Sequence, residues 1–124
     1  MGRLSYLLDS NILSESSRPR PHVNVQSRLL AHRHEVCTAA PVLHEMRYGI
    51  ALMPEGRRKR ALTGYLEQVL NQPLTVLPYD REAALWYAEE RARLRLSRAH
   101  TPFIDGQIAA IAGFAGLTVE NWFA

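Results

Sequence analysis

The sequence predicts an α/β fold in three layers, with a short, mostly parallel sheet of about four strands flanked by helices. Short apolar stretches with strand character alternate with longer segments whose apolar residues recur at helical spacing. Two helical segments begin at a proline, Pro41 and Pro102, and the last one ends at Gly116, which are typical helix boundaries. Because parallel strands need crossover helices between them, this alternation favours a parallel sheet.

The individual elements follow from these patterns. We expect strands at residues 3–8, 35–40, 74–77 and 117–119. We expect helices at about residues 23–32, 41–53, 57–70, 81–95 and 101–115. Residues 9–11 are turn and capping types, residues 18–21 are a proline-rich loop, and Asp80 is placed to cap the fourth helix. The apolar face of that helix is predicted to consist of Ala84, Leu85, Ala88, Ala92 and Leu96.

Length and composition predict one domain, residues 1–124, in the cytoplasm. A chain of 124 residues with 47% hydrophobic and 22% charged residues has the composition of a globular domain with one core. The apolar stretches are far shorter than the roughly 20 residues that cross a bilayer, and no charged start precedes an apolar signal core, so no membrane association is expected. The single cysteine, Cys37, lies in an apolar strand and is expected to be buried and unreactive.

The charge pattern is compatible with an anionic partner. The net charge is +3, and basic residues gather at 57–60 and at Arg91, Arg93, Arg95 and Arg98. Each cluster alone is also what a solvated helix face contains, so charge by itself is weak evidence for nucleic-acid binding.

Three carboxylates from distant segments are expected to converge. Asp9 follows the first strand, Glu45 lies near the start of the helix after the second strand, and Asp105 lies in the first turn of the last helix. In parallel α/β sheets, ligands bind beyond the carboxyl ends of the strands, where all three belong. Each residue also has an ordinary structural explanation, as a turn former, a surface acid and a favourable charge at a helix N-terminus respectively.

Clustered carboxylates are costly to desolvate and repel one another, so a site that gathers them normally binds a cation. Oxygen ligands favour Mg²⁺ or Mn²⁺, which activate water and neutralise charge during phosphodiester hydrolysis. The sequence contains no glycine-rich phosphate loop and no serine-hydrolase elbow, and its five histidines form no zinc-binding pair.

Three motifs resemble those of the PIN-domain toxins of the VapC and FitB type. Residues 7–15, Leu-Leu-Asp-Ser-Asn-Ile-Leu-Ser-Glu, resemble the opening motif L-L-D-T-N-x-L-S-E. Residues 38–49 resemble the second motif, in which the acid precedes an apolar-Arg-Tyr-Gly run, and residues 104–110 resemble the third, D-x-x-I-A-A. The motifs occur in the family's order and cover almost the whole chain.

The resemblance implies a PIN fold and an Mg²⁺- or Mn²⁺-dependent endoribonuclease, the toxin of a type II toxin–antitoxin module. It also implies a homodimer that is inhibited by a small antitoxin. By position, Asp9, Glu45 and Asp105 match the family's metal-binding carboxylates, Asn11 matches the asparagine that supports the first, and Ser10 replaces the usual threonine.

The C-terminus departs from the family pattern. Family members usually continue into T-R-N or T-R-D and a later D-F, whereas here Val119 is followed directly by Glu120-Asn121-Trp122-Phe123-Ala124. A fourth ligand is therefore missing or displaced, unless Glu120 or Asn121 replaces it. The alternative to a ribonuclease is a PIN-like domain that no longer cleaves and instead binds RNA or the antitoxin.

Overall fold

The computed structural model describes residues 3–98, 102–119 and 122, and these form four strands and six helices. The strands are β1 (Tyr6–Leu7), β2 (Val36–Ala39), β3 (Thr75–Leu77) and β4 (Thr118–Val119). The helices are α1 (Ser10–Glu15), α2 (Val23–Ala31), α3 (Ala40–Ala51), α4 (Arg57–Asn71), α5 (Arg81–Leu96) and α6 (Phe103–Ala115).

The four strands form one parallel sheet in the order β3-β2-β1-β4, as predicted. Tyr6 of β1 is paired with Val36 on one side and with Thr118 on the other. A buried hydrogen bond of 2.8 Å from the Thr38 hydroxyl to the Leu8 carbonyl extends the link between β1 and β2 towards their carboxyl ends. The strand ends that carry the candidate carboxylates are therefore held side by side.

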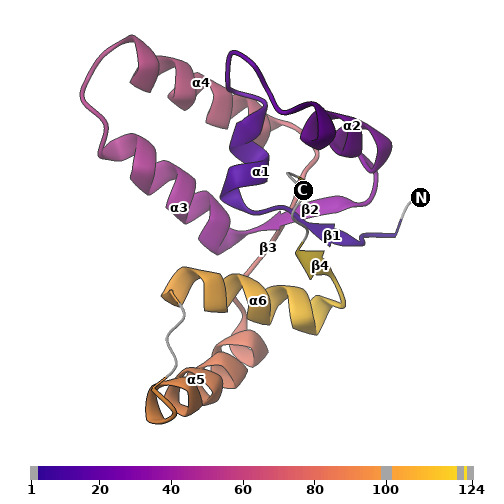
Figure 1. Ribbon diagram of the computed structural model, residues 1–124, viewed down its shortest axis with the longest axis vertical. Coiled ribbons are helices and arrows are strands. Elements are labelled where there is room, and N and C mark those ends of the chain that lie inside the picture. Colours follow the sequence, from indigo (N-terminus) through magenta and orange to yellow (C-terminus); the bar gives the residue numbers. More distant parts are fainter. Residues whose placement is uncertain (1–2, 99–101, 120–121, 123–124) are drawn as a thin grey trace.

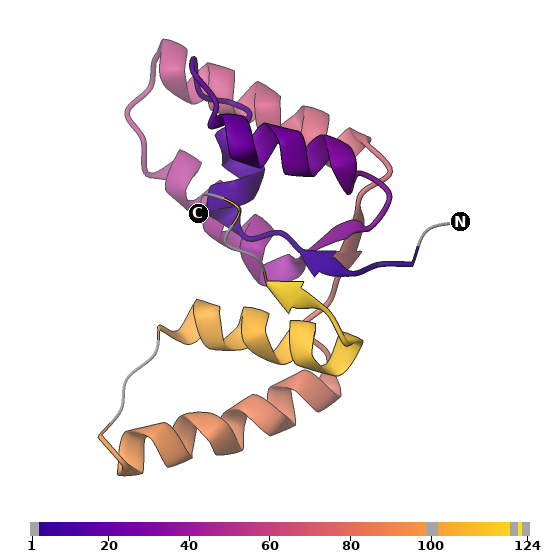
Figure 2. The same ribbon diagram turned by 45° about the vertical axis from the view of Figure 1, so that its right-hand side comes forward.

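Helices cover both faces of the sheet, which confirms the three-layer architecture. Figures 1 and 2 show α5 and α6 on one face and α1, α2 and α4 on the other. Helix α3 contacts α1 and α4 and also contacts α6, so it joins the two helical layers near the carboxyl edge of the sheet.

The core lies between the sheet and the helices around it. Leu7, Val25, Cys37 and Val42 are fully buried. Cys37 is buried, as predicted, and burial raises the pKa of its thiol because the thiolate would lose its hydration. No helix in the described ranges is long and apolar enough to span a membrane.

The first strand is shorter than predicted, and a helix follows it that the sequence did not indicate. Residues 9–11 were predicted to be turn and capping residues: Asp9 is indeed a cap, but Ser10 and Asn11 begin α1, a helix of six residues. So short a helix shows little periodicity, and its serine and asparagine residues have modest helix propensity. It is stabilised by the Asp9 cap and by packing of the buried Ile12 and Leu13.

The predicted apolar face of α5 is wrong. Leu85 is 61% exposed and Leu96 is 86% exposed, whereas Ala83 and Tyr87 are buried. Helix α5 lies at the outside of its layer and packs mainly against α6, so only a narrow stripe is covered. Sequence periodicity cannot distinguish this stripe from the apolar residues beside it.

Candidate active site

Asp9 stands directly after β1 and forms the N-cap of α1. Its backbone is extended, with φ −83° and ψ 178°, and its carboxylate accepts a hydrogen bond of 3.0 Å from the Ile12 backbone N–H. An aspartate is favoured here because the first N–H groups of a helix lack partners within the helix. The cap fixes the half-buried Asp9 carboxylate at the carboxyl edge of β1.

Glu45 lies on α3 and is bonded to the residue after Asp9. The Ser10 hydroxyl donates a hydrogen bond of 2.6 Å to Glu45 Oε1, which joins α1 to α3. Both side chains are partly buried. The sequence identified both residues as candidates, and the structure shows that they are partners. Asn11 is exposed and lines the same pocket as Glu45.

Asp105 lies in the first turn of α6 and is exposed. Because α6 leads into β4, which runs parallel to β1, the helix begins at the carboxyl edge of the sheet. All three predicted carboxylates therefore belong to elements that meet this edge. Gly106, the next residue, is buried against the ring of Tyr87 so closely that an added Cβ would overlap that ring.

A pocket of about 240 Å³ opens beside Ser10 and Glu45, between α1, α3 and α4. Met46, Ile50, Met53 and Leu62 give it apolar walls, and Tyr65 lies at its α4 side. The Tyr65 hydroxyl donates a hydrogen bond to the Leu13 carbonyl, which ties α4 to α1. Burial raises the pKa of Tyr65, and a hydrogen bond with Ser16 partly offsets this. Tyr65 was not identified from the sequence as a residue of the site. Its position three residues after Leu62, on the same face of a predicted helix, was the available signal.

The three carboxylates do not form a compact metal-binding group. Within the described ranges, no three His, Cys, Asp or Glu side chains lie close enough together to hold a metal ion. The same part of the chain shows no ion pair between Asp9, Glu45 or Asp105 and a basic residue. Their oxygen atoms and lack of an internal counter-charge suit a hard cation. Their convergence on a single ion stays a prediction.

The end of the chain is anchored away from these carboxylates. Trp122 is 2% exposed, stacks on His32 with ring centroids 5.7 Å apart, and meets the edge of Tyr6 at 5.6 Å. Because Tyr6 is the first residue of β1, Trp122 lies toward the amino edge of the sheet. Glu120 and Asn121, the possible substitutes for a fourth ligand, lie outside the described residues.

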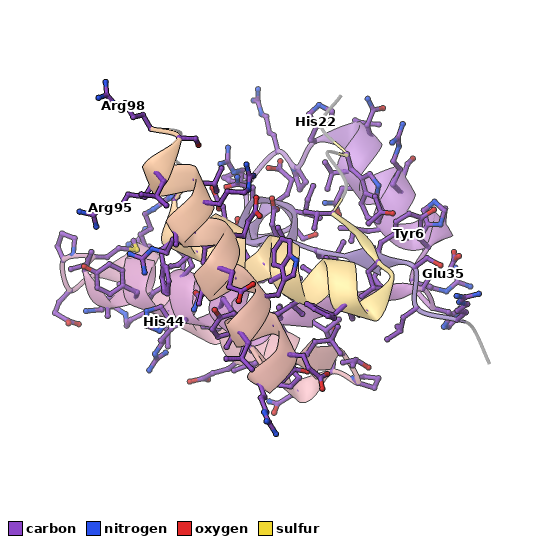
Figure 3. All side chains as sticks on the ribbon, turned by 90° about the horizontal axis from the view of Figure 1, so that it is seen from below. Tyr6, His22, Glu35, His44, Arg95 and Arg98 are labelled. Carbon is purple, nitrogen blue, oxygen red and sulfur yellow. The ribbon has the colours of Figure 1, made fainter. Side chains whose placement is uncertain are left out.

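The two basic clusters are partly engaged by the protein. Lys59 pairs with Glu55 at 2.8 Å, and Arg91 lies over the Phe103 ring at 4.6 Å. Arg93 hydrogen-bonds to Glu90 and holds the pKa of that exposed carboxyl below its usual value. The remaining members are exposed: Arg57, Arg58, Arg60, Arg95 and Arg98. Figure 3 shows Arg95 and Arg98 on the side of the molecule opposite Tyr6 and Glu35. Arg95 and Arg98 therefore lie on the carboxyl side of the sheet, because Tyr6 is the first residue of β1.

The chain is similar to several known proteins over almost its whole length. Toxin FitB of Neisseria gonorrhoeae is 36% identical over 93% of this chain and 85% of its own length. The tRNA(fMet)-specific endonuclease VapC of Salmonella typhimurium is 31% identical over 94% of this chain and 84% of its own length. The crystal structure of FitAcB from Neisseria gonorrhoeae superimposes with a TM-score of 0.77 at 36% identity, covering 92% of this chain and 84% of that one.

The model of the PIN-domain family matches residues 6–119, a range that runs from the first residue of β1 to the last residue of β4 and includes Asp9, Glu45 and Asp105. The fold, the order of the motifs and these relatives agree. The chain therefore belongs to the PIN-domain family.

Proposed function

We propose that this protein is a metal-dependent endoribonuclease and the toxin of a type II toxin–antitoxin module. The observation that carries the proposal is the placement of Asp9, Glu45 and Asp105 on elements that meet at the carboxyl edge of the sheet. These carboxylates have no basic ion-pair partner among the described residues. The relatives named as a toxin and as an endonuclease support the same assignment.

Asp9, Glu45 and Asp105 are the residues that would hold Mg²⁺ or Mn²⁺. When bound, such an ion supplies an activated water and neutralises charge that develops on the phosphodiester. The protein's own contribution is positional. The Ile12 N–H orients Asp9, and the Ser10 hydroxyl orients Glu45.

RNA is the proposed substrate, and exposed arginines supply the cations that hold its backbone. Arg95 and Arg98 lie at the end of α5 on the carboxyl side of the sheet (Figure 3). Backbone contacts of this kind depend on charge and not on base sequence, so they should weaken as salt concentration rises.

A second copy of the chain and a small antitoxin are the proposed protein partners. Leu85, Trp86 and Phe114 are exposed on α5 and α6, and a second pocket of about 230 Å³ lies beside Trp86 and Phe114. Apolar surface of this kind in a small domain is typically covered by a partner. Neighbouring solved structures of this fold are toxin–antitoxin complexes, which supports an antitoxin that covers part of this surface.

A second candidate function is a PIN domain that binds RNA or the antitoxin without cleaving. Two observations favour it: the described carboxylates are not gathered into one group, and Trp122 packs against Tyr6 at the amino end of β1, away from the carboxyl edge. If Glu120 nevertheless contributes to the site, Glu120→Gln should reduce cleavage about as much as Glu45→Gln. If it does not, Glu120→Gln should leave cleavage unchanged.

The deciding experiment is RNA cleavage by the purified full chain as a function of Mn²⁺ and Mg²⁺ concentration, with a chelator as the metal-free reference. The proposal predicts metal-dependent cleavage that is lost in Asp9→Asn, and growth arrest on expression of the parent chain but not of this variant. Metal-independent cleavage, or equal activity of Asp9→Asn, would contradict it. Cleavage only after a T-R-N-x-x-D-F ending is restored would establish the binding-only alternative for the natural chain.

A further inference from the structure

Two aromatic side chains stack on the exposed surface of α3, one turn apart. The rings of His44 and Tyr48 have centroids 6.3 Å apart and planes inclined by only 12°. Tyr48 is 59% exposed and His44 is also exposed. A pair at this spacing stabilises a helix to a small extent, but that role does not need side chains as exposed as these. The pair forms an exposed aromatic surface on α3.

This aromatic pair adjoins the candidate active site. His44 is the neighbour of Glu45 in the sequence, and Glu45 lines the pocket that also contains Ser10 and Asn11. Figure 3 places His44 on the same side of the molecule as Arg95 and Arg98. The exposed Arg47 lies on the same helix, between the two rings in sequence. Ring faces, guanidinium groups and the candidate carboxylates therefore occur together on one side of the protein.

We propose that His44 and Tyr48 form a stacking platform for an unpaired base of single-stranded RNA next to the scissile phosphodiester. The inference rests on the proposed ribonuclease function and adds two side chains that would contact the substrate. Aromatic faces beside a positively charged surface are how proteins bind single strands, because every base has a π-face and every nucleotide a phosphate. A base within a duplex offers no free face, so the platform would discriminate against paired RNA.

The charge of this surface favours nucleic acid over a protein segment. Arg47 lies on the same helix as the two rings, and Arg95 and Arg98 lie on the same side of the molecule (Figure 3), so a polyanion would meet cations there that a purely apolar contact would not need.

Binding of a fluorescent single-stranded oligoribonucleotide, measured by anisotropy in the non-cleaving Asp9→Asn background, tests the proposal. The matched probe has the same length but lacks bases in its central nucleotides. Tyr48→Leu keeps an apolar side chain without a ring, and Tyr48→Phe keeps the ring. Leu52→Ala, one turn further along the chain at a position that is 68% exposed, is the control for loss of apolar area alone.

Tyr48→Leu is expected to weaken binding of the base-containing probe about 5- to 150-fold, the range for loss of one stacked base. Tyr48→Phe and Leu52→Ala should bind like the parent. His44→Ala should also weaken binding, by no more than Tyr48→Leu does. All variants should bind the abasic probe equally. Arg95→Gln with Arg98→Gln should weaken both probes alike, because phosphates are common to both.

Three results would overturn the platform. The first is unchanged binding of the base-containing probe by Tyr48→Leu, and the second is an equal loss on both probes. The third is a change in sedimentation of Tyr48→Leu with RNA binding intact, which would assign the surface to contact between copies of the chain. Cleavage by the parent chain is measured separately. Base-dependent binding without metal-dependent cleavage would refute the ribonuclease and leave the platform standing.

Discussion

The Ser10 hydroxyl and Glu45 Oε1 lie 2.6 Å apart, and this hydrogen bond joins residues 35 positions apart in the sequence. It holds Glu45 in place from the first turn of the neighbouring helix. Ser10→Ala should therefore lower cleavage, at a cost of about 1 kcal/mol in stability, while Ser10→Thr should restore both because it keeps the hydroxyl. The measurement is the full metal dependence of cleavage together with urea unfolding. Equal loss in Ala and Thr variants would show that the hydroxyl does not position Glu45.

Close packing between α5 and α6 sets the position of the Asp105 turn. Gly106→Ala would drive a methyl group into the ring of Tyr87, and the overpacking should cost about 1–3 kcal/mol. Gly113→Ala lies on the same helix, where an added Cβ would meet nothing within 4 Å, and it should instead stabilise the protein by about 0.5–1 kcal/mol. Thermal unfolding of the two variants compares them directly. A similar shift in both would mean that Tyr87 moves aside without cost.

A buried thiol and a half-buried phenol should make the protein less stable in alkali. Burial raises the pKa of Cys37 above its ordinary 9.0 and that of Tyr65 above its ordinary 10.0. As pH rises through these values, the unfolded chain loses its protons first, so the stability that is present at lower pH is progressively lost. Urea unfolding against pH should show this fall, and Cys37→Ala with Tyr65→Phe should flatten it. An unchanged slope in the double variant would assign the fall to other groups.

The buried side chain of Trp122 should contribute more to the free energy of unfolding than an exposed side chain of the same size. It is 2% exposed between His32 and Tyr6, and Trp122→Ala should cost about 3–5 kcal/mol. Trp86 is 46% exposed, so Trp86→Ala is a matched control with a smaller loss. Urea unfolding followed by circular dichroism measures both without relying on tryptophan emission. Equal losses would indicate that the tail is not anchored by its ring.

The sequence predicts the elements of this fold better than it predicts their contacts. Helical periodicity and proline boundaries placed five of the six described helices, because long amphipathic segments repeat their pattern several times. Helix α1 was missed because its six residues complete fewer than two turns. The apolar face of α5 was misassigned because Leu85 and Leu96 have the same chemistry as core residues, and only tertiary packing exposes them.

The candidate site shows the same division. The positions of Asp9 and Glu45 relative to the predicted strands and helices selected these two residues, and motif resemblance added Ser10. The Ser10–Glu45 bond depends on how α1 and α3 pack, which no spacing in the sequence encodes. The contact between Tyr87 and Gly106 likewise depends on the packing of two helices, α5 and α6. No motif in the sequence around either residue predicts it. His44 and Tyr48 stand at helical spacing in the sequence, yet their exposure is visible only once the face buried by α3 is known.

Divalent metal should stabilise the protein through the candidate carboxylates, and this can be measured without any RNA. Ligand that binds only the folded state raises stability by about 2.7 kcal/mol at a hundred times its dissociation constant, so Mn²⁺ should raise the melting temperature in a saturable manner. Asp9→Asn should abolish that rise and slightly raise the metal-free melting temperature, because it relieves repulsion among the carboxylates.

Asp80→Asn is the matched control: Asp80 caps α5 through a 3.0 Å bond to the Ala83 N–H, just as Asp9 caps α1 through a 3.0 Å bond to the Ile12 N–H. Asparagine is as good a cap as aspartate, so both variants should keep their helices, and only the Asp9 variant should lose the response to metal. A rise of the same size in both would place the ion elsewhere, and no rise in the parent chain would show that the carboxylates do not bind metal in the free protein.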